Sequence, residues 1–348
     1  MTIRDEVFMQ RCLDLARNGL GSTAPNPMVG AVIVHEGRII GEGFHQACGQ
    51  AHAEVNAVNK VGNPDLFEKS TLYVNLEPCN HQGRTPPCTE LILQKKIPKV
   101  VIGQADPNPL VAGSGLSRLL DKGVEVITGV LEKESRFLNR RFNMFHEQKR
   151  PYLILKWAQT RDGFVDTLRN ETGKERPTWI TDDVCRRLVH KWRSEEPAIL
   201  TGSNTVLMDN PQLNVRAWSG KDPVRITIDR QGRIPLSFNL LDQTVPTLIY
   251  TCTDKSSKPN LEFIRICPDE PVWPQVLGDL YKRDIQSVLI EGGPTLFKTL
   301  IDAGLWDEVR VFTGPGWLGC GVKAPEFPYA PAARETIGNS EVTVFYRT

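Results

Sequence analysis

Three residues of metal-binding type lie close together in the N-terminal part of the chain and restrict how it can fold. His52 is followed by Cys79 and Cys88. One imidazole and two thiolates form a common ligand set for tetrahedral zinc, and three protein ligands leave the fourth position open for water. Such a site is of the catalytic type. We therefore expect a fold that brings these three side chains together.

Glu54 follows His52 closely, in the sequence H-A-E. A carboxylate beside a water of lowered pKa can move protons, so Glu54 is the candidate catalytic acid–base. H-x-E followed by P-C-x-x-C is typical of zinc-dependent nucleobase deaminases, although a longer insert separates Cys79 from Cys88 here. The alternatives are a structural zinc, or a buried histidine with two cysteines serving as small apolar residues. Glu54 and the open ligand position argue against both.

Length and charge restrict the class of protein. The 348 residues correspond to two domains at about 150 residues each. The 42 Lys and Arg nearly balance the 41 Asp and Glu, and the net charge of +1 argues against a nucleic acid or an anionic membrane as main partner. No apolar run is long enough to span a bilayer, and the N-terminus has no secretory signal pattern. We therefore expect a cytoplasmic protein with reduced cysteines.

Apolar strands alternate with amphipathic helices in both halves, which predicts an α/β fold in each. In the first half we expect helices at 5–19, 52–60 and 89–96, a hairpin of strands 29–34 and 38–44, and strands at 71–76 and 99–102. In the second half we expect strands at 152–157, 198–201, 225–229, 247–251, 287–290 and 308–312, with helices at 182–192 and 295–303. The mixed-charge segment 140–151 predicts the boundary between domains 1–146 and 147–348.

Three segments of the first half resemble the deaminase domain of the bifunctional riboflavin-biosynthesis deaminase/reductase family. They are A-P-N-P-M-V-G-A-V-I-V at 24–34, H-Q-G-R-T-P-P-C at 81–88 and D-P-N-P-L-V-A-G-S-G at 106–115. The longer insert between the cysteines is normal in that family. The resemblance implies an N-terminal cytidine-deaminase-like domain with α/β/α layers.

The same resemblance implies specific roles for residues of the first half. Zinc (Zn2+) would be bound by His52, Cys79 and Cys88, with Glu54 as proton donor and acceptor. Four further residues match substrate-pocket positions of the family: Asn26, His45, His81 and Arg84. Asn75 stands where the family usually has threonine.

The second half is similar to the reductase domain of the same family, whose fold is like dihydrofolate reductase. The similarity rests on L-K-W-A-Q-T-R-D-G at 155–163, W-I-T at 179–181, the segment 199–216 and S-V-L-I-E-G-G-P-T at 287–295. In the last segment a strand ends in Gly-Gly before a helix, an arrangement that lets the backbone approach a phosphate closely. The alternative is a tight turn with nothing bound.

The resemblance implies two sets of contacts in the second half. NADPH contacts are implied for Ala158, Trp179, Thr205, Asp209, Gly293, Pro294 and Thr295. Substrate contacts are implied for Lys156, Arg193, Leu213, Arg216 and Glu291. Guanidinium groups bind a ribose phosphate well, which supports the assignment of Arg193 and Arg216 as substrate contacts. Pro177 and Arg230 depart from the family pattern, which has a hydroxyl residue at each position. We interpret Arg186, Arg187 and Lys191 as the solvated face of a helix.

The resemblance therefore implies an enzyme with two activities in riboflavin biosynthesis. The first domain would hydrolytically deaminate 2,5-diamino-6-(5-phosphoribosylamino)pyrimidin-4(3H)-one with zinc, and the second would reduce the ribosyl group to a ribityl chain with NADPH. The partner would be this small pyrimidine ribotide phosphate, with no nucleic acid and no membrane, and we expect a homo-oligomer. The alternative is a nucleic-acid or nucleoside zinc deaminase with a C-terminal accessory domain.

Overall fold

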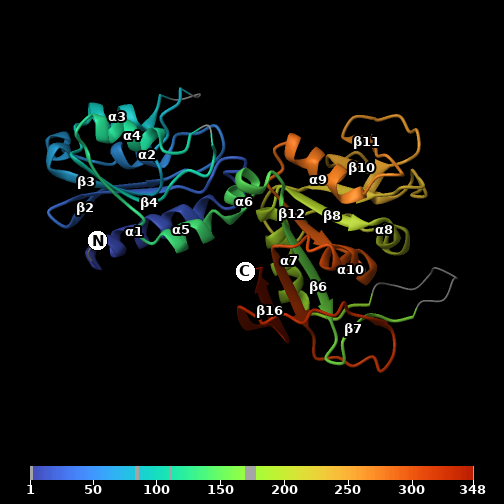
Figure 1. Ribbon diagram of the computed structural model, residues 1–348. Coiled ribbons are helices and arrows are strands. Elements are labelled where there is room, and N and C mark those ends of the chain that lie inside the picture. Colours follow the sequence, from blue (N-terminus) through green and yellow to red (C-terminus); the bar gives the residue numbers. More distant parts are fainter. Residues whose placement is uncertain (1–2, 83–85, 110, 169–177, 348) are drawn as a thin grey trace. The chain divides into compact units, whose positions relative to one another are not determined.

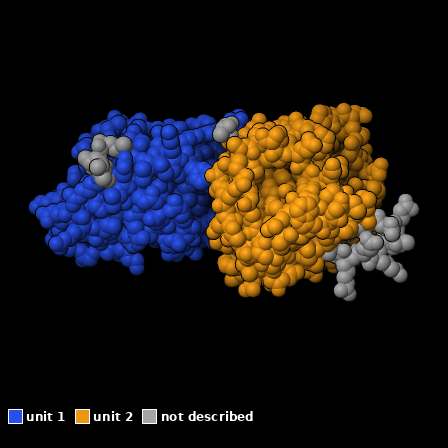
Figure 2. Space-filling view, turned by 90° about the horizontal axis from the view of Figure 1, so that it is seen from below, with its two compact units in different colours: residues 1–149 blue, residues 150–348 orange. Residues whose placement is uncertain are grey.

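The chain folds into two compact units, 1–149 and 150–348 (Figures 1 and 2). The structure is a computed structural model that describes residues 3–82, 86–109, 111–168 and 178–347. The units divide slightly beyond the expected boundary because the mixed-charge segment begins with a helix, α6 (Arg140–Gln148), that completes unit 1. Among the described helices, none combines the length and the apolar character needed to cross a membrane.

Unit 1 is built on a five-stranded sheet of order β2-β1-β3-β4-β5 (Figure 1). The strands are β1 (Gly30–His35), β2 (Arg38–Phe44), β3 (Ser70–Leu76), β4 (Lys99–Gln104) and β5 (Glu125–Thr128). The other helices are α1 (Ile3–Ala16), α2 (Ala53–Val58), α3 (Cys88–Gln94), α4 (Ser114–Asp121) and α5 (Glu132–Leu138), with 3-10 turns η1 (Arg17–Gly19) and η2 (Pro64–Lys69). The expected hairpin of β1 and β2 is confirmed, and β3, β4 and β5 run parallel.

Helices cover both faces of this sheet, which makes three α/β/α layers (Figure 1). On one face, α1 packs through Met9 and Cys12. On the other face, α2, α3 and α4 pack through Ala57, Ile92 and Leu119. Because the central strands are buried on both sides, they are nearly continuous apolar runs, as parallel sheets require.

Two buried asparagines hold the segment that leads into β1. Asn75 Oδ1 accepts a hydrogen bond from the Gly30 N–H at 2.8 Å, and Asn75 Nδ2 donates to the Met28 carbonyl at 3.1 Å. Asn139 bonds the N–H and the carbonyl of Met28, each at 2.9 Å. A Cβ atom at Gly30 would lie 2.0 Å from the Cys12 carbonyl oxygen, so α1 can approach β1 only because this residue is glycine.

Unit 2 is built on a nine-stranded sheet of order β11-β10-β9-β8-β12-β6-β13-β16-β15. The sheet is parallel from β11 to β13, and β16 and β15 continue it in antiparallel pairing. The strands are β6 (Tyr152–Gln159), β8 (Ala198–Gly202), β9 (Val224–Ile228), β10 (Thr247–Thr251), β11 (Leu261–Arg265), β12 (Ser287–Glu291), β13 (Glu308–Thr313), β15 (Ala333–Ile337) and β16 (Ser340–Tyr346). A separate small sheet pairs β7 (Phe164–Asp166) with β14 (Val322–Lys323).

Helices also cover both faces of the large sheet. They are α7 (Asp183–Glu195), α8 (Ser203–Asp209), α9 (Val272–Lys282) and α10 (Pro294–Asp302), with a 3-10 turn η3 (Asn239–Leu241). α9 and α10 pack on one face, through Leu280 and Phe297 among others. α8 and α7 pack on the other face, through Val206 and Val189. All strands and helices expected in this half are present, whereas α8, α9, β7, β11, β14, β15 and β16 were not expected.

The side chain of Asn75 gives a test of this packing. We expect Asn75→Ala to lower the free energy of unfolding of unit 1 by about 1–3 kcal/mol, because the Gly30 N–H is left buried without its acceptor. Urea unfolding followed by circular dichroism measures the change. Asn59→Ala, at an exposed position of the same unit, serves as the control and should shift stability by less than about 0.5 kcal/mol. Equal effects of the two substitutions would contradict the role of Asn75.

Candidate functional sites

The three predicted metal ligands converge in unit 1. His52 immediately precedes α2, Cys88 is the first residue of α3, and Cys79 lies in the segment after β3. His52 Nδ1 is 3.3 Å from Cys88 Sγ and 3.5 Å from Cys79 Sγ, and all three ligand atoms lie within 4.8 Å of one another. Zinc bonds of about 2.0 Å to nitrogen and 2.3 Å to sulfur separate tetrahedral N and S ligands by about 3.5 Å. The donor set and its spacing therefore fit zinc.

Local backbone structure organises this cluster. The Cys88 N–H donates to Cys79 Sγ at 3.4 Å, at the start of a helix where backbone N–H groups have no intrahelical acceptor. A hydrogen bond from the Cys88 thiol lowers the pKa of the Cys79 thiol, and the His52 imidazole lowers it further. Cys79 is thus favoured as the thiolate, the form that binds metal, whereas the same hydrogen bond and burial raise the pKa of the Cys88 thiol.

Glu54 lies in the first turn of α2 and is 4% exposed. Burial raises the pKa of its carboxyl group, and the neighbouring Cys79 raises it further. A carboxyl group with a raised pKa beside a metal site suits repeated uptake and release of a proton.

Two of the four predicted substrate contacts of unit 1 form a pair. Asn26 Nδ2 donates to His45 Nε2 at 3.1 Å, and His45 Nδ1 bonds the Ala51 carbonyl at 3.1 Å. The His45 ring meets the His52 ring edge-on with centroids 5.6 Å apart, so the pair lies beside the metal ligands. His81 is exposed. Arg84 falls outside the described residues.

Glu77 is a positioning residue that the sequence analysis missed. Its buried carboxylate accepts backbone N–H bonds from four residues of the segment that follows β4: Asp106, Gly113, Gly115 and Leu116, at 3.0–3.2 Å. Glu77 stands directly before the Pro78-Cys79 pair, and this proximity to a ligand is the signal that could have identified it. Through Glu77 the described residues of this segment, 106–109 and 111–116, are held beside the segment that carries Cys79.

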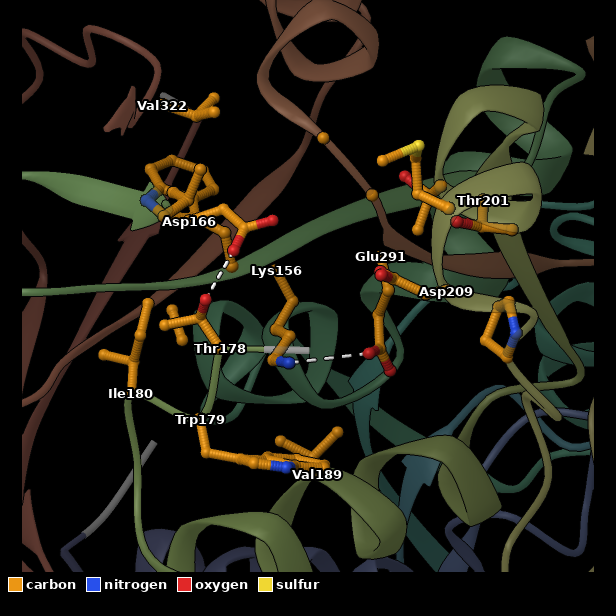
Figure 3. Close-up of a pocket in the computed structure, with 18 of the residues that line it drawn as sticks. Lys156, Asp166, Thr178, Trp179, Ile180, Val189, Thr201, Asp209, Glu291 and Val322 are labelled. Carbon is orange, nitrogen blue, oxygen red and sulfur yellow. Dashed lines mark hydrogen bonds and ion pairs between the residues drawn. The ribbon is translucent and has the colours of Figure 1, made fainter. Parts of the chain in front are cut away.

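A pocket of about 700 Å³ lies at the carboxyl ends of β6, β8 and β12 in unit 2 (Figure 3). In open α/β sheets this edge is the usual place for ligands. Every residue predicted for the second half lines it. The predicted cofactor contacts are Ala158, Trp179, Thr205, Asp209, Gly293, Pro294 and Thr295, and the predicted substrate contacts are Lys156, Arg193, Leu213, Arg216 and Glu291.

Glu291 is the electrostatic centre of this pocket. Arg193 contacts both of its carboxylate oxygens, with Nε 2.8 Å and Nη2 3.0 Å away, and Lys156 Nζ lies 3.4 Å away (Figure 3). Burial by itself would raise the pKa of Glu291, but the charges of Arg193 and Lys156 outweigh it and hold the pKa at about 2. Arg193 is therefore neutralised, whereas Arg216 bonds the amide oxygen of Asn214 and, among the described residues, no carboxylate.

The other end of the pocket fits a phosphate-bearing cofactor. Gly293 precedes α10, and the first N–H groups of this helix have no intrahelical acceptor. A Cβ atom at Gly293 would lie 3.7 Å from Thr205 Oγ1, so the hydroxyl of α8 borders the same turn. Backbone donors and the positive end of a helix favour the diphosphate of a dinucleotide, which fits NADPH.

At the rim of the pocket, the structure corrects the prediction that Arg186 belongs to the solvated face of a helix. Trp179 is 62% exposed, and the Arg186 guanidinium lies 4.5 Å from its ring centroid. Arg186 therefore lines the pocket, whereas Arg187 and Lys191 are exposed as expected. The difference arises because Trp179, which precedes α7, lies against the first turn of that helix.

Of the two departures from the family pattern, Arg230 donates to the Pro268 carbonyl, and Pro177 falls outside the described residues.

Two family models match the chain. The RibD C-terminal domain matches residues 151–328, which include the pocket. The cytidine and deoxycytidylate deaminase zinc-binding region matches residues 2–104, which include the cluster of His52, Cys79 and Cys88.

Individual proteins match over nearly the whole chain. Riboflavin biosynthesis protein RibD of Synechocystis sp. is 42% identical over 329 residues, which cover 93% of this chain and 87% of that protein. A diaminohydroxyphosphoribosylaminopyrimidine deaminase/5-amino-6-(5-phosphoribosylamino)uracil reductase from Thermotoga maritima has a solved structure that is 37% identical, with a TM-score of 0.88 and 99% coverage of both chains. RibD of Acinetobacter baumannii, form 1, is 34% identical, with a TM-score of 0.88 and the same coverage.

Removal of one ligand tests the metal cluster. We expect Cys88→Ser to weaken zinc binding by at least about a hundredfold, since even changes beside metal ligands cost 10- to 100-fold. Metal analysis of purified protein and competition with a chromogenic chelator measure the change. Cys48→Ser, at an exposed cysteine of the same unit, is the matched control. Zinc retained at full stoichiometry by Cys88→Ser would contradict the assignment.

The lowered pKa of Glu291 predicts a pH-dependent contribution to stability. Its folded pKa of about 2 lies below the value of about 4.3 of an unfolded glutamate. The contribution is therefore fully present above about pH 5 and is lost as the pH falls toward 2. We expect Glu291→Gln to destabilise unit 2 by about 2–3 kcal/mol at pH 7 and by clearly less at pH 3.

Urea unfolding at pH 7, 5 and 3 measures this difference. Glu335→Gln changes an exposed carboxylate in the same unit and should show little dependence on pH. A Glu291→Gln effect that stays constant from pH 7 to pH 3 would refute the electrostatic account of the pocket.

Proposed function

The chain belongs to the RibD family of bifunctional riboflavin-biosynthesis enzymes, and from this premise we propose which residues carry its two activities. It is a zinc-dependent deaminase fused to an NADPH-dependent reductase. One observation carries the residue assignment: the described residues form a His/Cys/Cys cluster in unit 1 and a pocket around a buried carboxylate in unit 2. Family membership favours the ribotide enzyme over a nucleic-acid or nucleoside deaminase.

Unit 1 deaminates the diaminopyrimidine ribotide for which the Thermotoga relative is named. When bound, zinc supplies the Lewis acidity that makes water a nucleophile near neutral pH. Glu54 accepts a proton from the attacking water on its carboxylate and delivers it to the ring amine. A C–O bond forms, the C–N bond breaks, and the amine leaves as ammonia. Asn26 and His45 hold the pyrimidine ring beside the metal ligands, and His81 and Arg84 contact the rest of the ribotide.

Unit 2 reduces the ribosyl group of the deaminated product to a ribityl chain. NADPH supplies the hydride when bound. The turn from Gly293 to Thr295 holds the cofactor phosphates at the start of α10, and Thr205 and Asp209 border them from α8. Ala158 and Trp179 contact the remainder of the cofactor.

The substrate end of the pocket lies around Glu291. Lys156 and Arg193 hold this carboxylate in one position, where it can accept hydrogen bonds from sugar or uracil. Arg216 is free of carboxylates among the described residues and is therefore the cation available for the substrate phosphate. Leu213 supports the segment that carries Arg216.

We further place the enzyme in the cytoplasm as a homo-oligomer. A reducing compartment keeps Cys79 and Cys88 available to bind zinc. Trp317 is 72% exposed and Tyr329 is also exposed, and a second copy of the chain could cover such aromatic surface. Light scattering of the purified protein tests the oligomeric state, and a monomer at micromolar concentration would refute it.

The division of labour is tested by Glu54→Gln. We expect deamination to fall by at least about a hundredfold, because proton transfer is lost, while reduction of separately supplied deaminated substrate is unchanged. Ammonia release and NADPH oxidation are followed in separate assays. Glu36→Gln, at a turn between β1 and β2, is the control. Loss of both activities in a folded Glu54→Gln variant would contradict the assignment of one activity to each unit.

A further inference from the structure

Arg233 lies at the border of the unit 2 pocket, bonded to uncharged groups. It belongs to the loop that follows β9, and its Nη2 donates to Asn204 Oδ1 at 2.9 Å and to Ser203 Oγ at 3.4 Å. Asn204 lines the pocket. Among the described residues, both acceptors of Arg233 are neutral oxygens, and its side chain is exposed. Arg233 therefore keeps its positive charge beside the pocket.

Hydrogen bonds hold the loop that carries Arg233 in one conformation. Asp229, which directly follows β9 and is 1% exposed, accepts the Ile234 N–H on Oδ2 at 2.9 Å, and its carbonyl accepts the Gly232 N–H at 3.1 Å. Lys255 Nζ donates to the Gly232 carbonyl at 2.8 Å. Gly232 has a φ of +66°, a left-handed conformation that favours glycine. The loop thus turns the Asp229 carboxylate inward and directs Arg233 to the start of α8.

The strand order places this loop next to the phosphate end of the pocket. The order β9-β8-β12-β6 with parallel pairing brings the carboxyl ends of four strands to one edge of the sheet. Lys156 lies on β6, Glu291 ends β12, and the turn at Gly293 follows it. The next strand is β8, and the loop with Arg233 follows β9, one strand further and about 4.8 Å away in the sheet.

This order decides the direction of a bound dinucleotide. With the diphosphate at the turn 293–295, the nicotinamide must lie toward Glu291, because its hydride has to reach the substrate. The adenosine then extends past Thr201 of β8, which lies on the side of Glu291 away from Trp179 (Figure 3). Thr201 Oγ1 is buried and has no hydrogen-bond partner among the described residues, so this side of the pocket offers an open hydroxyl. The adenosine ribose thus comes to lie beside Arg233.

The charges at this end match the group that distinguishes NADPH from NADH. NADPH carries an additional phosphate on the 2′ oxygen of the adenosine ribose. Lys156 and Arg193 are paired with Glu291, whereas Arg233 bonds neutral oxygens. A guanidinium binds phosphate through charge-assisted hydrogen bonds, and in other dinucleotide-binding folds an arginine near the ribose accommodates the 2′-phosphate.

We propose that Arg233 binds the 2′-phosphate of NADPH and thereby determines the preference of the reductase for NADPH over NADH. Ser203 and Asn204 hold the guanidinium through Nη2, and its Nε and Nη1 have no protein acceptor among the described residues. These donors are available for the phosphate oxygens. The proposed placement of the cofactor diphosphate at the turn from Gly293 to Thr295 is the premise of this assignment.

Arg233→Gln tests the assignment because it removes the charge and keeps a polar side chain. We expect the Kd of NADPH to rise about 10- to 100-fold, the loss expected when hydrogen bonds between charged groups are removed, while the Kd of NADH stays within about threefold. Calorimetric titration of the full chain with each nucleotide measures both constants. Arg233→Lys keeps the charge without the planar fork and should retain part of the preference.

Two exposed arginines of unit 2 serve as controls. Arg230 lies on the same loop but donates to the Pro268 carbonyl at 3.0 Å, and Arg334 lies on β15 at the far edge of the sheet. Arg230→Gln and Arg334→Gln should leave both constants within about threefold of wild type. Adenosine 2′,5′-bisphosphate and adenosine 5′-phosphate, which lack the nicotinamide, should show the same selective loss in Arg233→Gln. Circular dichroism confirms that each variant is folded.

Gly293→Val separates this proposal from the function proposed for unit 2. A Cβ atom at Gly293 would lie 3.7 Å from Thr205 Oγ1, so a valine takes up space at the turn and should weaken NADPH and NADH alike. If Gly293→Val changed neither constant, the placement of the diphosphate would fail. An unchanged Kd of NADPH in Arg233→Gln, an equal loss for NADH, or loss of the preference in Arg230→Gln instead would overturn the role of Arg233 alone.

Discussion

Parallel pairing of β8, β12 and β6 is the constraint on which the reductase pocket depends. Because these strands run in one direction, the polar residues at their carboxyl ends meet at a single edge of the sheet. The register aligns Glu291 directly with Lys156, and α7 brings Arg193 to the same carboxylate. Removal of one partner would leave a buried charge unpaired and would destabilise the folded pocket.

In the deaminase unit the fold positions the functional side chains in a different way. Two of its metal ligands stand where helices begin, and the third follows β3, so the sheet and its covering helices determine where the three ligand atoms meet. Glu77 and Asn75 then attach the neighbouring segments through backbone hydrogen bonds. The side chains of both residues form hydrogen bonds to the main chain. Glu54 is therefore the carboxylate beside the metal ligands that is available for proton transfer.

The two sites also explain the small net charge of the chain. Charged residues in the pocket of unit 2 largely cancel one another, since Glu291 neutralises Arg193 and Asp183 pairs with Arg186. Among the described residues of the pocket, Arg216 bonds an amide oxygen and no carboxylate, so its charge is not cancelled. A small phosphorylated substrate needs no extended basic surface, in contrast to a nucleic acid.

Patterns that are local in the sequence determined the α/β class, most strands, the metal ligands and Glu54, and the family resemblance supplied the pocket residues. Asn75 and Glu77 were beyond that reasoning, because their hydrogen-bond partners lie 29 to 47 positions away. Tertiary structure alone decided that Glu291 neutralises Arg193 and not Arg216. This pairing depends on burial and on charges from separate elements, and folding brings these elements together at the carboxyl edge of a parallel sheet.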